Sequence, residues 1–137
     1  MSEYLVCDTE IKDQDCLVDT LVEMGVERDH IEVHEEAVPL EGYHGDLRKQ
    51  RAHVVIRRRH VGNASNDVGF ELKDGSYKAW VSEYDKGHGI GKKIMSKELL
   101  RQYAKVKALN EIRGRRGFKV KSCEEKDGKI KIKVLVS

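Results

Sequence analysis

Two Asp-Gly turns constrain the fold of this chain more than any other feature. Asp74-Gly75 separates an apolar run at residues 68–72 from a second run at 77–81, and Asp127-Gly128 precedes alternating apolar residues at 130–136. Asp-Gly between two such runs is a strong β-hairpin signal, because both residues accept the positive backbone angles of a tight turn. Since hairpin strands pair antiparallel, the sequence predicts a mainly antiparallel sheet.

Apolar residues at helical spacing predict two helices. Asp13 is placed to cap the first helix and Gly25 to end it, and the apolar face between them comprises Cys16, Leu17, Thr20, Leu21 and Met24. The second helix is expected from Ser96 to about Arg113, with a stripe that is expected to be buried and comprises Leu99, Leu100, Tyr103, Val106 and Ile112.

Further strands are expected at residues 4–7, 31–34 and 53–56, whereas Pro39, Gly42 and Gly45 predict a loop over residues 36–46. A chain of 137 residues suits one domain, here residues 1–137. The element order predicts an α+β fold, a mainly antiparallel sheet with two helices packed on one face. A ferredoxin-like and a duplicated βαβ arrangement are both compatible with this order.

Charge is distributed very unevenly along the chain. Residues 1–45 hold two basic and thirteen acidic residues, a net charge of −11, whereas residues 86–137 hold sixteen basic and five acidic residues, a net charge of +11. The segment between them holds eight basic and six acidic residues. This asymmetry favours contact between the two ends or a separate partner for one of them, and the basic end makes nucleic acid a candidate.

Cysteine content and hydropathy indicate the cellular setting. The three cysteines, Cys7, Cys16 and Cys123, are odd in number and form no CxxC pair, and residues 1–8 do not resemble a secretory signal. These features favour free thiols in a reducing, cytoplasmic setting. Because no apolar run approaches the roughly 18 residues that cross a bilayer, we expect no membrane partner.

Several short motifs follow one another in a characteristic order: Val55-Ile56-Arg57, Asp67-Val68-Gly69-Phe70, Asp74-Gly75-Ser76-Tyr77 with Trp80, Arg101-Gln102-Tyr103-Ala104, Gly117-Phe118 and Asp127-Gly128-Lys129-Ile130. With these the chain resembles the Ycf-thirty-five-like family of small uncharacterised proteins of cyanobacteria, plastids, other bacteria and some bacteriophages. The resemblance is clearest over residues 53–134; neither the acidic N-terminal third nor residues 87–91 match it. It implies a single small α+β domain, without an established activity or catalytic residues to transfer.

Two basic clusters are candidates for contact with a nucleic-acid backbone or an acidic protein: Arg57, Arg58 and Arg59 at a predicted strand end, and Arg113, Arg115, Arg116, Lys119 and Lys121. Pairing of the first cluster with the acidic N-terminal third is an equally good interpretation. Lys129, Lys131 and Lys133 alternate along one face of the last strand, where they suit either a partner or protection against aggregation. No aromatic motif for base stacking accompanies these residues.

A basic glycine-rich loop is expected before the second helix, and its residues Gly87, Gly89, Gly91, Lys92 and Lys93 are a candidate anion site. The segment is not a Walker loop, which requires glycine in place of Lys86 and Ser or Thr in place of Lys93. The alternative interpretation is a flexible basic connector. His30 and His34 lack a third ligand at metal-binding spacing, so we expect neither a metal nor a cofactor.

These observations favour a small non-catalytic binding or adaptor protein, whose basic surface engages nucleic acid or an acidic protein partner. A first alternative is a self-associating structural or regulatory protein, a homo-oligomer in which acidic and basic parts of neighbours meet. A second alternative is an enzyme that acts on a phosphorylated small molecule at residues 87–93, with Asp85 and His88 as the nearby acid–base candidates.

Overall fold

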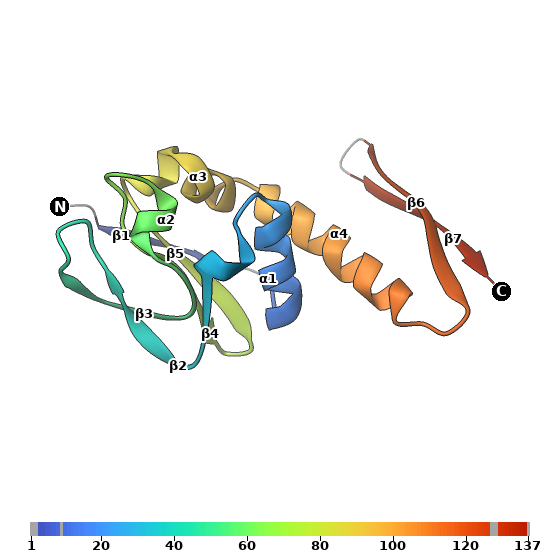
Figure 1. Cartoon of the computed structure of the whole chain (residues 1–137), viewed down its shortest axis with the longest axis horizontal. Coiled ribbons are helices and arrows are strands. Elements are labelled where there is room, and N and C mark those ends of the chain that lie inside the picture. Colours follow the sequence, from blue (N-terminus) through green and yellow to red (C-terminus); the bar gives the residue numbers. More distant parts are fainter. Residues whose placement is uncertain (1–2, 9, 127–128, 137) are drawn as a thin grey trace.

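The computed structural model describes residues 3–8, 10–126 and 129–136 (Figure 1). Its helices are α1 (Gln14–Glu23), α2 (Arg58–Val61), α3 (Gly89–Met95) and α4 (Glu98–Arg113), with 3₁₀ turns η1 (Arg28–His30) and η2 (Asp85–Gly87). Its strands are β1 (Tyr4–Asp8), β2 (Ile31–Glu41), β3 (Leu47–Ile56), β4 (Val68–Lys73), β5 (Ser76–Ser82), β6 (Phe118–Lys126) and β7 (Lys129–Val136).

The strands form two antiparallel sheets, which confirms the expected α+β class. The larger sheet has the order β1-β5-β4-β3-β2, and the smaller one is the β6–β7 hairpin. Asp74 and Gly75 join β4 to β5 with φ angles of 54° and 84°, as an Asp-Gly hairpin requires. The second Asp-Gly pair, Asp127-Gly128, lies outside the described residues. Neither the ferredoxin-like nor the duplicated βαβ arrangement occurs in the described chain, because each requires a second strand–helix–strand unit within the same sheet, whereas the chain after β5 and α4 continues into the separate β6–β7 hairpin.

The prediction of a loop over residues 36–46 is wrong for residues 36–41, which belong to strand β2. Strand β2 continues to Glu41 through Pro39, which lies opposite Arg51 of β3. Strand β2 is at the edge of the sheet, and an edge strand tolerates a proline because one side of it needs no hydrogen-bond donor. The pairing register also shifts on both sides of this segment, which bends the β2–β3 hairpin.

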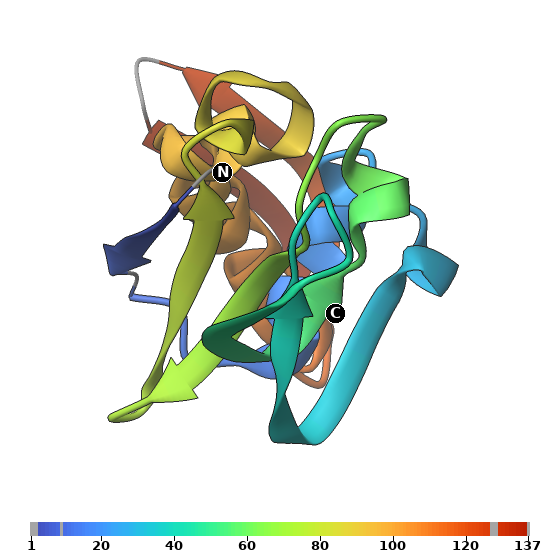
Figure 2. The same cartoon turned by 90° about the vertical axis from the view of Figure 1, so that its left-hand side faces the viewer.

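Helices α1, α3 and α4 cover one face of the larger sheet (Figure 2). The Asp13 carboxylate caps α1 by accepting from the backbone N–H of Cys16 at 3.0 Å, and Gly25 follows the helix with φ 104°. The Tyr103 hydroxyl of α4 accepts from the backbone N–H groups of Lys12 and Asp13. The two predicted helices are therefore confirmed, and Tyr103 ties the start of one to the middle of the other.

The expected apolar stripe of α4 is correct for three of its five residues. Leu99, Tyr103 and Val106 are buried, but Leu100 is 37% exposed and Ile112 is half-buried. Leu100 lies about 100° around the helix from Leu99, away from the face that meets the sheet.

Opposite the helices, the sheet carries a smaller apolar cluster of Tyr4, Leu40, Ala52 and Val55. Gly69 of β4 lies beneath it. A Cβ atom added at Gly69 would lie 2.5 Å from Cβ of Ala52 and 2.8 Å from Cδ2 of Leu40, so a side chain has no room there. The close approach of β2 and β3 to β4 thus depends on this glycine.

Candidate functional site

A buried carboxylate, Asp67, joins four segments that are distant in sequence. Its side chain is completely buried and accepts from the backbone N–H of Glu41 (2.7 Å), the backbone N–H of Arg58 (2.7 Å) and Nη1 of Arg57 (2.8 Å). The Tyr4 hydroxyl donates to its backbone carbonyl oxygen at 2.6 Å. With three donors the buried charge is satisfied, and the group holds the end of β2 and the start of α2 against β4.

The predicted Arg57-Arg58-Arg59 cluster does not emerge together into solvent. Arg57 donates from Nε to both carboxylate oxygens of Glu32 (3.1 and 3.0 Å) as well as to Asp67, and Nε of Arg58 lies 3.7 Å from Oε1 of Glu41. Arg58 and Arg59 begin the short helix α2 rather than extend the strand. Arg57 and Arg58 thus pair with Glu32 and Glu41 of the acidic N-terminal third. The Arg57 side chain is 25% exposed and that of Arg58 is 37% exposed, and Arg59 is exposed.

Electrostatics around Arg57 reinforce this arrangement. Burial alone would lower the pKa of Arg57, but its hydrogen bonds to Glu32 and Asp67 outweigh burial and raise it. Burial would likewise raise the pKa of Glu32, but its hydrogen bonds with Arg57 and His34 lower it. Both shifts favour the charged forms, so the Glu32–Arg57–Asp67 chain is a structural ion network.

A second buried carboxylate, Asp85, organises the turn after β5. Its Oδ2 accepts from the backbone N–H of Asn66 (2.9 Å) and from the Ser82 hydroxyl (2.7 Å). Its Oδ1 is buried and has no hydrogen-bond partner among the described residues. Because the Asp85 side chain has no exposed surface, it meets no substrate in this conformation. His88, its expected companion, is exposed and stacks on Tyr84 with ring centroids 4.5 Å apart.

Residues 87–93 form a turn and a helix rather than the expected flexible loop. Gly87 ends η2, Gly89 starts the seven-residue helix α3 with φ 49°, and Gly91 is buried against the backbone of Asp85. Lys92 and Lys93 are exposed, and Nζ of Lys93 donates to the backbone carbonyl of Met24 at 3.4 Å. The helix forms because Ile94 inserts into the core beneath it. Anion binding by this segment stays a prediction.

The second predicted cluster is the exposed one. Arg113 ends α4, Arg115 and Arg116 lie in the following turn, and Lys119 and Lys121 lie on β6. All five are exposed, and none forms an ion pair with an acidic residue in the described part of the chain. We call these five residues the junction cluster, because they surround the connection between α4 and the β6–β7 hairpin.

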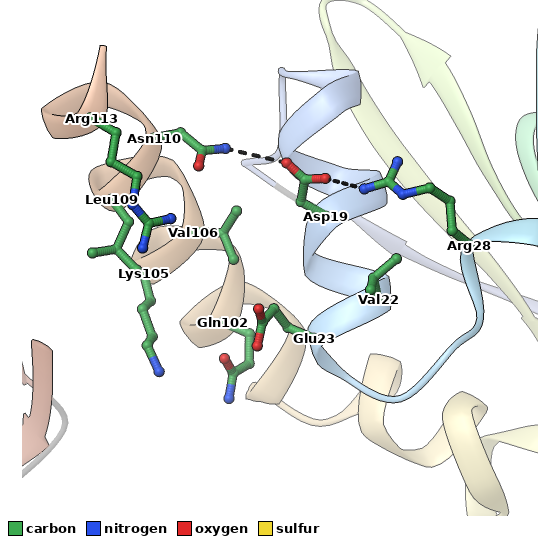
Figure 3. A pocket seen from close by; sticks show the side chains of 10 residues that line it. All are labelled: Asp19, Val22, Glu23, Arg28, Gln102, Lys105, Val106, Leu109, Asn110 and Arg113. Carbon is green, nitrogen blue, oxygen red and sulfur yellow. Dashed lines mark hydrogen bonds and ion pairs between the residues drawn. The ribbon is translucent and has the colours of Figure 1, made fainter. Parts of the chain in front are cut away.

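A cleft of about 410 Å³ lies between α1 and α4, next to the junction cluster (Figure 3). Asp19, Val22 and Glu23 line it from α1, and Lys105, Val106, Leu109 and Arg113 line it from α4. The Asp19 carboxylate is bound to Arg28 and to the Asn110 amide (3.4 Å). The sequence patterns do not predict this cleft. The sequence contains only a weak indication of it: Gln102, Lys105 and Arg113 recur at helical spacing along α4, beside the buried stripe.

The arrangement is that of a small α+β protein with two structural buried carboxylates and a basic end. None of the described helices is long and apolar enough to cross a membrane. The chain belongs to the family described as Protein of unknown function (DUF1257), whose model matches residues 20–133. No curated protein and no solved structure matches it. The resemblance to the Ycf-thirty-five-like proteins stays a prediction.

Proposed function

We propose that this protein is a non-catalytic binding or adaptor protein whose junction cluster engages nucleic acid or an acidic protein. The observation that carries the proposal is the unequal use of the two basic clusters. Arg57 and Arg58 are occupied by Glu32 and Glu41, whereas all five members of the junction cluster are exposed without an ion-pair partner in the described chain.

Concentrated positive charge of this kind suits a partner that carries repeated negative charge. Several unpaired cations within a few residues repel one another, and a chain of phosphates or carboxylates relieves that repulsion while releasing its own counterions. Of the junction cluster only Arg113 lines the cleft that Asp19 and Glu23 of α1 also line, and Asp19 is already bound to Arg28 and Asn110. The acidic third of the chain therefore leaves the junction cluster open to a partner.

Charge reversal at the junction cluster tests this proposal. The test variant carries Arg113→Glu, Arg115→Glu and Arg116→Glu, and a matched control carries Lys49→Glu, Lys73→Glu and Lys86→Glu. The control residues are exposed and lie on β3, β4 and η2, so both variants change the net charge equally. Gel shift with single- and double-stranded DNA and RNA, at several sodium chloride concentrations, measures the affinity.

We expect the wild type to bind all sequences alike, with a log–log salt slope of about −0.9 per phosphate contact on duplex DNA. The test variant should bind at least about tenfold more weakly, and the control should bind like the wild type. If the wild type retains no nucleic acid at low salt, the proposal of a nucleic-acid partner fails. Salt-sensitive binding to poly-glutamate then tests the proposal of an acidic protein partner. Light scattering separates self-association: an oligomer that the test variant disrupts would favour that alternative instead.

A further inference from the structure

The β6–β7 hairpin has two unlike faces. Residues that lie opposite each other in an antiparallel pair share a face. Lys119 pairs with Leu135, Ser122 with Lys133 and Glu124 with Lys131, and the side chains of all but Ser122 are exposed. The other face carries six half-buried, mostly apolar residues, Phe118, Val120, Cys123, Ile130, Ile132 and Val134, together with the exposed Val136 opposite Phe118 and with Glu125 opposite Ile130. We call the first of these the lysine face.

The hairpin stands apart from the larger sheet. In Figure 1 it lies at the far end of α4 from the five-stranded sheet, with α4 between them. An isolated two-stranded hairpin is marginally stable in water, and a hairpin gains stability when its apolar face packs on a helix. The partial burial of the apolar face agrees with such packing, and it leaves the lysine face directed to solvent.

We propose that the lysine face of β6–β7 binds the major groove of duplex DNA. This inference rests on the proposed function and names both the ligand and the element that binds it. The major groove is about 12 Å wide and admits a two-stranded ribbon, whereas the minor groove is about 6 Å wide. Paired strands lie about 4.8 Å apart, so the hairpin with its side chains suits the wider groove.

The charges on the hairpin match this placement. Lys131 and Lys133 project from the same face of β7 about 6.8 Å apart, since each strand residue advances about 3.4 Å. Lys119 extends the row on β6, and the junction cluster continues it at the base of the hairpin, where it can reach backbone phosphates beside the groove. Glu124 reduces the positive charge of the face without cancelling it.

Two further features favour duplex DNA over other nucleic acids. The major groove of A-form RNA is deep and too narrow for side chains to read, which disfavours duplex RNA. Single strands are bound through aromatic side chains that stack on bases, and no aromatic residue lies on the lysine face among the described residues.

The test removes the lysines and keeps the junction arginines. Lys119→Gln, Lys131→Gln and Lys133→Gln are combined, and the matched control combines Lys49→Gln, Lys73→Gln and Lys86→Gln; the urea unfolding midpoint verifies that each variant folds. Fluorescence anisotropy compares a 20-base-pair DNA duplex (about two helical turns), its single strand and an RNA duplex of the same sequence. Dimethyl sulfate footprinting reports the groove, because guanine N7 lies in the major groove and adenine N3 in the minor groove.

We expect the wild type to prefer duplex DNA and to protect guanine N7. The lysine variant should bind the duplex at least about tenfold more weakly, with a salt slope shallower by about 0.9 for each phosphate that it no longer neutralises, and the control should match the wild type. Undiminished binding by the lysine variant, protection of adenine N3 alone, or preference for single strands or duplex RNA would overturn the inference. If the arginine variant of the previous section abolishes binding while the lysine variant does not, the proposed function stands and only the groove assignment fails. Absence of all nucleic-acid binding by the wild type removes the nucleic-acid arm itself.

Discussion

Replacement of Asp67 by asparagine should destabilise the protein strongly, although the two side chains have almost the same shape. The carboxylate is completely buried and accepts three hydrogen bonds: Oδ1 from the backbone of Arg58, and Oδ2 from the backbone of Glu41 and from Arg57. An asparagine amide has one acceptor oxygen and one donor group. Whichever way the amide is turned, its NH₂ group faces at least one N–H donor.

The expected loss follows from these contacts. An unsatisfied buried donor costs about 1–3 kcal/mol, and removal of one partner from a buried charge pair costs about 3–5 kcal/mol. Arg57 keeps its two hydrogen bonds to Glu32 and its side chain is 25% exposed, which places the charge effect at the low end of that range. We therefore expect Asp67→Asn to lower the free energy of unfolding by about 3 kcal/mol.

Urea denaturation, followed by circular dichroism and by the fluorescence of the single tryptophan, Trp80, measures the change. Asp74→Asn is the matched control. Asp74 is exposed and has a φ of 54°, a conformation that asparagine tolerates, so the control should stay within about 0.5 kcal/mol of the wild type. A loss at Asp67 below about 1 kcal/mol would refute the role of this carboxylate as the central acceptor.

Three other expectations concern single contacts. Leu99→Ala should cost about 2–5 kcal/mol in urea unfolding, because Leu99 is 1% exposed, whereas Leu100→Ala, at 37% exposure, should cost less than about 1 kcal/mol; equal losses would contradict the burial of α4. Gly69→Ala should cost about 1–3 kcal/mol, because the added Cβ would lie 2.5 Å from Cβ of Ala52; a thermal midpoint unchanged from the wild type would show that β3 moves aside freely. The pKa of Glu32 lies below its ordinary value of 4.5, so its contribution to stability is complete above about pH 4.5 and is lost as the pH falls through the lowered pKa. Glu32→Gln should therefore make stability less sensitive to pH below about 4.5, and curves that stay parallel in acid would argue against the ion network.

Local signals in the sequence determined the elements whose cause lies within a few residues. Asp74-Gly75 predicted the β4–β5 hairpin, and Asp13 and Gly25 predicted the ends of α1, because turns and helix caps depend on neighbouring backbone groups. The density of basic residues between Arg113 and Lys121 likewise indicated a candidate binding cluster, and these five residues are exposed in the folded chain.

Only the tertiary structure decided features that depend on partners far along the chain. Pro39 interrupts a strand pattern locally, yet the chain stays extended there because β3 pairs with it and the other edge of β2 needs no partner. Residues 87–93 become helical because Ile94 finds a place in the core. Arg57 could be interpreted from the sequence as a ligand of a partner or of the acidic third, and only the folded structure shows its contacts with Glu32 of that third and with Asp67.

The buried carboxylates mark the limit of sequence reasoning most clearly. Aspartate is usually exposed, and nothing in the residues beside Asp67 or Asp85 indicates complete burial. The backbone N–H donors that offset the cost of burial come from residues 9 to 26 positions away. Hydropathy and periodicity describe one element at a time, whereas the free energy of a buried charge depends on which donors the folded chain brings around it.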